Sequence, residues 1–449
     1  MALAVALGAS AVATAAAPPS PLSLAQAISY ALEHRPDIQL SVARASASEA
    51  EVGVGRVAYL PGLSLFAQEN RATGDVVAGS IFDMPGLPTT SGATARPSFN
   101  AGVFGSALGA SFDWNVDLLQ RIAAVDALLA ASDRARKGVA AERLRVAYAA
   151  GDAYLELAVE GETVRADEVN VERARVFATT VDATVKQQLR PAADASRAAA
   201  ILSLARIDLA RAKEARSIGR ARLAEALGAP SARFEIVKGP LLAAPGEAPR
   251  FASPSPVNPF LLERSAAVVA ARQRRRSVGL EYLPRVDLVA ALWARGSGYD
   301  STAVAGGLLP DTPNWGAGVA VSWPAMDLFL VRAKLRVQAA ELQGEIERQR
   351  QVAVDVAGEI DAANGALDGA QAIAKETPTA VASARVTEAQ ALARYGAGLV
   401  SVVDVAEAER ILARAEVEDA IARLNVRRAE LLLARAVGDL SPFLAEVGG

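Results

Sequence analysis

The sequence predicts a mostly α-helical fold with a small β part, because one pattern of helices and strands occurs twice along the chain. Arg35–Ile38 opens a segment that closes with Tyr59–Pro61, and Asn258–Leu261 opens one that closes with Tyr282–Pro284. Both ends repeat at an offset of 223 residues, so the two segments align without a gap. Solenoid repeats span about 20–50 residues, so a repeat of this length indicates duplication of a whole structural half.

The same duplication appears in the helical part of the chain. Three residues of the first half, at its predicted turn and helix end, recur in the second half at an offset of 210 residues. The pairs are Leu189 and Leu399, Asp194 and Asp404, and Gly228 and Gly438. Any role assigned to one half must therefore have a counterpart in the other half.

A very long helix followed by a returning helix is predicted in the first half, over 118–227. No proline occurs between Pro97 and Pro191, and a helix over 118–189 would extend about 108 Å at 1.5 Å per residue. Ordinary globular helices have about 8–20 residues, so this length indicates a coiled coil. The returning helix, from Asp194, is expected to end at Gly228, a favourable residue after a helix.

The second half carries the corresponding hairpin over 328–437, with a heptad seam on each helix. A period of 3.5 residues predicts a left-handed supercoil, but the sequence leaves open whether the partner is the same chain or a neighbour. The residues of the seams are Leu335, Ala339, Leu342, Ile346, Ala353, Val356, Ile360, Ala363, Leu367, Ala370 and Ala374, and then Val405, Ala408, Leu412, Ala415, Ala422, Val426, Ala429, Leu433 and Ala436.

Pro378 interrupts the long helix of the second half, where the first half has Glu168. Proline removes a backbone donor and clashes with the preceding turn. We therefore expect a kink or break near 373–377, either as an accident of sequence or as a hinge that makes the halves unequal.

Two pairs of strands are predicted, one before each hairpin, because apolar and polar residues alternate there with a period of two. The expected strands are 62–73, 100–114, 285–295 and 315–323, with loops at 74–99 and 296–313. Trp114 and Trp323 end the second strand of each pair, and each is either an aromatic at a membrane interface or a packed junction residue.

Composition excludes several classes of function. The net charge of −3 and pI of about 5.6 provide no basic surface of the nucleic-acid-binding type. The chain has no cysteine, which excludes thiol chemistry. It has a single histidine, His34, so a Ser-His-Asp triad without that residue is also excluded. No P-loop, HExxH motif or Glu-x-x-His pair occurs, so we predict no enzyme, no cofactor and no metal site.

The expected organisation begins with a signal peptide at 1–17, whose small residues match an A-x-A cleavage pattern although no basic residue precedes them. The first repeat follows at 22–240, a proline-rich linker at 241–257, the second repeat at 258–440 and a tail at 441–449. No other run of about 18 apolar residues is present, so a membrane would have to be crossed by strands.

The order of these elements, with four short segments, resembles the TolC family of outer-membrane efflux proteins. The resemblance covers the chain from about 22 to 440 and rests on order, duplication and spacing more than on any single motif. The segments are Leu22–Ile28, Ala31–Ile38, Tyr59–Pro61 and Arg394–Glu409.

The resemblance implies a homotrimer in the outer membrane, with the helical part in the periplasm. Each protomer would give four strands to one transmembrane barrel of twelve strands, and the long hairpins would form an α-barrel coiled coil below it. Four strands cannot close a barrel alone, and an open edge in lipid is forbidden, so sharing strands is physically reasonable. The implied function is the exit duct of a tripartite efflux or type I secretion system, with a periplasmic adaptor (membrane fusion) protein and an inner-membrane pump as partners.

The resemblance also places a gate at the periplasmic tips of the hairpins. Asp404 matches an aspartate that lines the entrance in the family, Glu407 matches a second acidic position, and Asp194 is the first-half counterpart of Asp404. Capping of a helix N-terminus is the alternative role for these acids. Val400 stands where the family often has a basic residue. The residues expected to contact the adaptor are Leu189, Arg190, Gly398, Leu399, Val400 and Ser401.

A different class of function remains as the alternative, a periplasmic coiled-coil adaptor or scaffold without a channel. It would explain the heptads but would leave the duplicated strand pairs without a role.

Overall fold

The computed structural model describes residues 18–73, 102–230, 233–242, 250–251, 253–298, 306–323 and 326–447. The expected signal peptide at 1–17 and the loop at 74–99 lie outside the described residues, as does part of the loop at 296–313. The chain divides into two compact units. The first contains the residues up to Ser46, Arg134–Ala266 and those from Glu347 on; the second contains Ala47–Asp133 and Ala267–Ile346.

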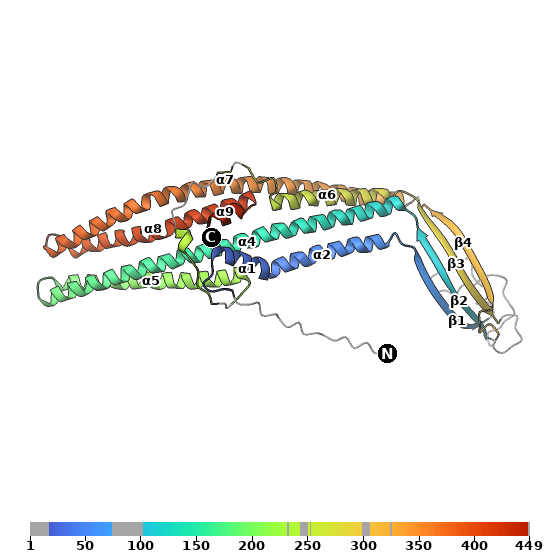
Figure 1. The fold of residues 1–449 in the computed structure, drawn as a ribbon, viewed down its shortest axis with the longest axis horizontal. Helices are drawn as coiled ribbons and strands as arrows, with labels where there is room; N and C mark the ends of the chain where they lie inside the picture. The colour runs from blue at the N-terminus through green and yellow to red at the C-terminus, as the bar shows by residue number, and fades with distance from the viewer. Residues whose placement is uncertain are drawn as a thin grey trace. The chain divides into compact units, whose positions relative to one another are not determined.

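The predicted fold class is confirmed, since two strand pairs and two long helical hairpins recur in the same order (Figure 1). Each compact unit draws on both halves of the duplicated sequence. The elements are α1 (Leu24–His34), α2 (Pro36–Val57), β1 (Gly62–Thr73), β2 (Gly102–Asn115), α4 (Leu118–Lys186), α5 (Ala192–Leu227), η1 (Gly239–Leu242), α6 (Pro259–Leu280), β3 (Arg285–Ser297), β4 (Thr312–Ser322), α7 (Asp327–Gly396), α8 (Val402–Val437) and α9 (Ser441–Val447).

The four strands form one antiparallel sheet in the order β1-β2-β3-β4, as Figure 1 shows. The two sequence repeats thus meet at the β2–β3 pair, where Ala110 lies opposite Leu292. The outer strands β1 and β4 each have one edge without a strand partner among the described residues. Such edges present unpaired backbone groups that another chain can complete.

One face of this sheet is apolar across all four strands. Directly opposed residues share a face, and the row Leu65, Ala110, Leu292 and Trp315 follows from the register. Three side chains of this row are well exposed, Leu65 at 81%, Leu292 at 65% and Trp315 at 79%. The other face carries smaller and more polar residues, such as Ser64 on β1. The exposed apolar residues of the first face also include Leu63, Leu108, Val319 and Val321.

The two tryptophans that end the strand pairs have the same role in both halves. Trp114 Nε1 donates to the backbone oxygen of Tyr59 at 3.0 Å, and Trp323 Nε1 donates to that of Tyr282 at 3.2 Å. Each bond ties the end of one strand to the turn before its partner strand. Both tryptophans therefore bond at the junction of strand and turn, and Trp323 keeps 58% of its surface exposed. The alternative of an aromatic at a membrane interface stays a prediction.

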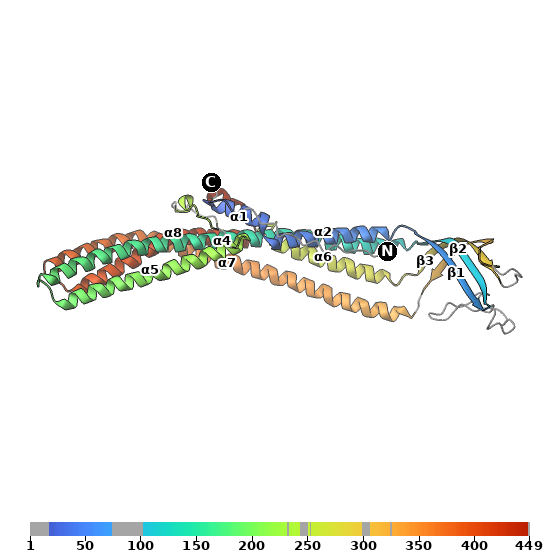
Figure 2. The same cartoon turned by 90° about the horizontal axis from the view of Figure 1, so that it is seen from below.

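The helical seams of α7 and α8 pack against each other within the chain, which answers the question that the sequence left open. Ile360 and Leu367 of α7 are fully buried in one cluster with Val426 and Leu433 of α8. Small residues of both helices, Ala363 and Ala429 among them, lie in the same cluster. Figures 1 and 2 show the α4–α5 and α7–α8 hairpins side by side toward their turns. Within the described chain, no helix combines the length and the apolar character needed to cross a bilayer.

Of the kink or break expected near Pro378, the break is wrong, while the kink stays a prediction. Helix α7 is continuous from Asp327 to Gly396 with Pro378 inside it. Contacts with α8 lie just before the proline, where Ala374 packs in the α7–α8 cluster and Thr377 Oγ1 donates to Asp419 at 2.9 Å. Because proline removes only one backbone donor, this packing outweighs the local cost.

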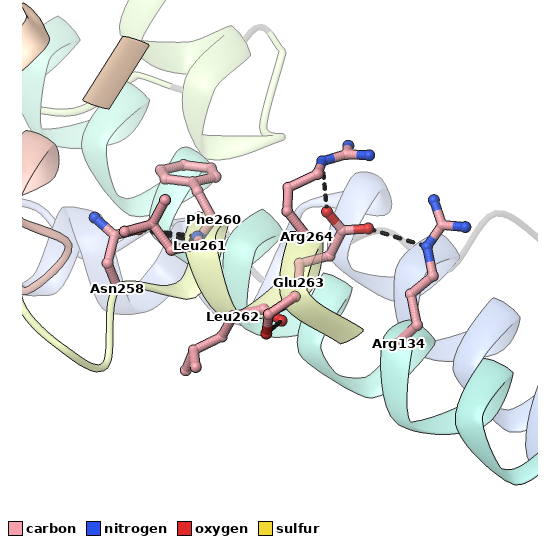
Figure 3. Close-up of polar contacts among 8 residues, drawn as sticks. Arg134, Asn258, Phe260, Leu261, Leu262, Glu263 and Arg264 are labelled. Carbon is pink, nitrogen blue, oxygen red and sulfur yellow. Dashed lines mark hydrogen bonds and ion pairs between the residues drawn. The ribbon is translucent and has the colours of Figure 1, made fainter. Parts of the chain in front are cut away.

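The beginning of each repeat is tied to the end of the returning helix of that repeat. In the second half, buried Asn258 caps α6 by accepting from Phe260 N at 3.0 Å (Figure 3). Its Nδ2 donates to the Ala436 and Val437 oxygens, each at 3.1 Å. In the first half, Arg35 donates instead to the Glu225 oxygen near the end of α5 at 2.6 Å. Different side chains thus make equivalent ties.

A charged bridge reinforces the start of α6. Figure 3 shows the Glu263 carboxylate between Arg134 of α4, at 3.2 Å, and the neighbouring Arg264, at 2.9 Å. Glu263 is largely buried, so its pairing with two guanidinium groups offsets the cost of removing its charge from water.

Candidate functional site at the helical tips

The turns of the two hairpins have closely similar geometry. Gln188 in the first turn has φ of 62°, and Gly398, at the equivalent position of the second turn, has φ of 77°. Glycine takes this left-handed conformation freely, whereas a residue with a side chain does so at a cost of about 1 kcal/mol or more. The next residue of each turn, Leu189 or Leu399, bonds back to the end of its long helix, to Thr184 or Arg394.

One tyrosine joins the two hairpins at their tips. The Tyr395 hydroxyl, at the end of α7, donates to Asp194 Oδ2, in the first turn of α5, at 3.0 Å. The Arg190 guanidinium lies 4.3 Å from the centre of the Tyr395 ring and also donates to the Tyr395 backbone oxygen. Burial raises the pKa of Tyr395, so the phenol keeps its proton and donates. We call these three residues the tip contact.

An apolar cluster supports the tip contact. The Tyr395 ring is 8% exposed and packs at 6.1 Å between centres against Phe177 of α4. Val181, Ala198, Val402 and Val405 complete the buried set, which therefore draws on α4, α5, α7 and α8. A pocket of about 480 Å³ borders it and is lined in part by Leu189, Arg190 and Gly398.

The two acids predicted at the start of α8 are both exposed, and each bonds within its own hairpin: Asp404 takes part in capping the helix, and Glu407 forms an ion pair. Asp404 accepts from the Ser401 backbone N and hydroxyl, each at 2.8 Å, and forms a capping box with that residue. Glu407 pairs with Arg410 at 2.6 Å. Hydrogen bonds from Ser401 lower the pKa of Asp404, and those from Arg410 lower the pKa of Glu407, so both are charged at neutral pH.

The two aspartates, which the duplication relates, therefore differ in their contacts. Asp404 caps its own helix, whereas Asp194 accepts its hydrogen bond from the other hairpin. Of the residues predicted to contact an adaptor, Leu189 and Leu399 are 68% and 73% exposed. Gly398 and Ser401 are exposed, Val400 is half-buried, and Arg190 turns toward Tyr395.

A cluster of charged residues, of which Glu409 is buried, lies behind the tips, where α8 meets α4 and α7. Glu416 accepts from Arg173 of α4 at 2.7 Å and from Arg385 of α7 at 3.1 Å. Glu409, two turns before it on α8, is 5% exposed, and its Oε2 has no hydrogen-bond partner among the described residues. Burial, with the charges of Glu388 and Glu416, raises the pKa of Glu409 against the opposing effect of Arg173.

This shift predicts that Glu409→Gln stabilises the folded chain at alkaline pH. Above its folded pKa, ionised Glu409 destabilises the native state, and the penalty disappears as the pH falls toward the ordinary value of 4.5. We expect the variant to unfold at a higher temperature than the wild type at about pH 8, and the difference to shrink at about pH 5.

The matched control is Glu407→Gln on the same helix, whose carboxylate is exposed and has a lowered pKa. This change should bring no gain in unfolding temperature at either pH. A Glu409→Gln protein less stable than the wild type at alkaline pH would contradict the assignment of an uncompensated charge.

The tip residues do not form a metal centre. In the described ranges, no three His, Cys, Asp or Glu side chains are grouped so that they could hold a metal ion. The arrangement consists of contacts between hairpins and of exposed charge.

Comparison with known proteins identifies the family of this duplicated fold. The model of a family described as outer membrane efflux protein matches residues 27–229 and 257–439, which is most of the chain and includes both hairpins. The chain belongs to the outer membrane efflux protein family. Membership confirms the suspected TolC-like relationship and the location in the outer membrane with the helical part in the periplasm.

Members of the outer membrane efflux protein family are efflux proteins and not enzymes, which fits the non-enzymatic reading of the sequence. This membership speaks against the alternative of a periplasmic coiled-coil adaptor or scaffold without a channel. A comparison with curated protein sequences gives no significant match.

Solved structures show the same fold at low sequence identity. VceC from Vibrio cholerae is 18% identical with a TM-score of 0.76, covering 93% of this chain and 96% of its own. CmeC from Campylobacter jejuni is 15% identical with a TM-score of 0.76, covering 92% and 85%. The open state of MtrE from Neisseria gonorrhoeae is 18% identical with a TM-score of 0.70, covering 93% and 89%.

Two important residues escaped the sequence analysis. Tyr395 lies within the segment that carries the family resemblance, but its partner Asp194 is 201 residues away, so no local pattern links them. Glu409 follows the predicted Glu407 by two residues, and only the packing of α8 shows that one side chain is exposed and the other buried.

Proposed function

We propose that three copies of this chain form a passive, gated exit duct through the outer membrane. The observation that carries the proposal is the four-stranded sheet, whose one face is exposed and apolar and whose two edges have no strand partner among the residues that the structure describes. Lipid would cover the apolar face, and β1 of one copy would pair with β4 of the next. Three sheets would then close one barrel of twelve strands and remove every open edge.

The hairpins of the three copies would form the wall of a tunnel in the periplasm, which closes at its tips in the resting state. The tip contact supports this, because Arg190 and Tyr395 join the two hairpins of one chain through few polar bonds. Breaking these bonds would let the hairpins separate. A periplasmic adaptor docking at the exposed Leu189 and Leu399 would trigger the change, and an inner-membrane pump would supply the energy.

Exposed acids near the tips would select among the ions that pass. Asp404 and Glu407 carry charge at neutral pH, and in a trimer each would occur three times around one axis. Rings of like charge in a narrow pore raise the local negative potential and favour cations.

The double variant Asp404→Asn, Glu407→Gln tests this role in single-channel recordings across planar bilayers. We expect the preference for cations over anions to fall several-fold and block by divalent cations to weaken, because the charge of both rings is removed. Asp182→Asn, a change of an exposed acid on α4, provides a control for charge alone. Unchanged selectivity and unchanged block in the double variant would remove both residues from the pore lining.

A further inference from the structure

A pocket of about 410 Å³ lies away from the tips, where residues 251–256 meet the end of α8 and the short helix α9. Its walls are mainly apolar and include Phe251, Leu433, Val437 and Phe443. Three prolines add further rigid apolar surface. The size falls in the range of about 300–1,000 Å³ that is usual for small-molecule sites.

A buried carboxylate with a free oxygen lines this apolar pocket. Glu430 is 7% exposed, and its Oε2 accepts from Arg427 at 2.9 Å. Its Oε1 is buried and has no hydrogen-bond partner among the described residues. An oxygen removed from water without a donor is costly, so a ligand that supplies an N–H group would be bound tightly here.

The charges around the pocket favour a cation over an anion. Arg427 also donates to Glu446, at 2.6 Å, so one guanidinium serves two carboxylates of the lining. Asp439 adds a third carboxylate at the rim. Glu430 and Glu446 together exceed the single charge of Arg427, which leaves the pocket with negative charge to be matched.

We propose that this pocket binds a small amphiphilic cation, a protonated amine with an apolar body. The ammonium group would donate to Glu430 Oε1, and the apolar body would fill the space between Phe251 and Phe443. Bound in this way, the ligand would tie α9 and the 251–256 segment to α8. The proposal concerns a site that the duct itself does not require.

The probe for this site is 2-(1-naphthyl)ethylamine, titrated by calorimetry into the full chain in lipid nanodiscs. The uncharged 1-ethylnaphthalene and the anionic 1-naphthylacetate are its matched analogues, and empty nanodiscs give the background of lipid partitioning. We expect saturable binding of the amine to the protein and at least about tenfold weaker binding of both analogues.

Two variants locate the binding. Glu430→Gln should weaken binding of the amine about tenfold or more, whereas Glu407→Gln, which removes an exposed carboxylate at the tips, should leave it unchanged. Ala434→Trp would fill the pocket from its half-buried wall while keeping all three carboxylates of the lining, and should abolish binding.

The proposal is overturned if the amine does not bind, or binds no better than its uncharged analogue. It also fails if Glu430→Gln binds like the wild type. If Glu430→Gln does not fold, Ala434→Trp gives the decisive test. Undiminished binding of the amine to this variant would show that the ligand binds elsewhere, and would overturn the proposal. If the pocket binds only a peptide segment of another protein, the amine will not bind, and the proposal is wrong.

Discussion

Tyr395→Ala is expected to produce channels that are open in the absence of any adaptor, with a clearly larger single-channel conductance than the wild type. The ring is buried among side chains of α4, α5, α7 and α8, and truncation of a buried aromatic costs about 3–5 kcal/mol. The substitution also removes the hydroxyl that binds Asp194 and the ring beneath Arg190. The loss falls on the contacts that join the two hairpins, so these should separate.

Two further variants divide the effect into its parts. Tyr395→Phe removes only the hydrogen bond to Asp194, a loss of about 1 kcal/mol, and should raise the conductance or the open time by less. Leu399→Ala changes a neighbouring side chain that is 73% exposed and should have no effect in recordings that contain no adaptor. Tyr395→Ala channels that remain as closed as the wild type would show that the tip contact does not hold the entrance shut.

Leu65→Arg is expected to reduce strongly the amount of assembled protein in the membrane. Leu65 lies on the apolar face of β1 and is 81% exposed, so the proposal places it against lipid. An arginine facing lipid costs up to about 2–4 kcal/mol, depending on its depth in the bilayer, and each copy in a trimer would bear that cost. The measurement is the yield of folded protein after extraction from outer membranes.

The control is the adjacent residue of the same strand. Ser64→Arg introduces the same side chain on the opposite face, which the proposal assigns to the water-filled interior, and should leave the yield nearly unchanged. Equal losses for the two variants would show that the faces of the sheet are not exposed to different surroundings.

Periodicity explains why the elements of this fold can be predicted from sequence. A strand needs only a period of two and a coiled coil only a heptad, so β1 and α7 are visible in local patterns. Duplication strengthens this, since Gly398 and Gln188 take the same left-handed conformation at positions that align. Of the kink or break expected at Pro378, the break was wrong, because the packing of α7 on α8 is not a local property.

Relations between distant segments account for what could not be predicted. In each single strand the alternation of apolar and polar residues is weak, because many residues are small. The apolar face appears only when the register places Leu65, Ala110, Leu292 and Trp315 in one row. The bond from Tyr395 to Asp194 likewise depends on how two hairpins meet. The pocket at Glu430 could not be predicted for the same reason, because its lining combines two stretches that are distant in sequence, one with Phe251 and one with Glu430.

The most direct test of the central claim, that three chains share one barrel, is the native mass of the protein after gentle extraction from the outer membrane. Native mass spectrometry should give a complex of three chains that persists until conditions unfold the sheet. A folded monomer or a dimer as the stable species would contradict the account, because neither would supply the twelve strands of the proposed barrel.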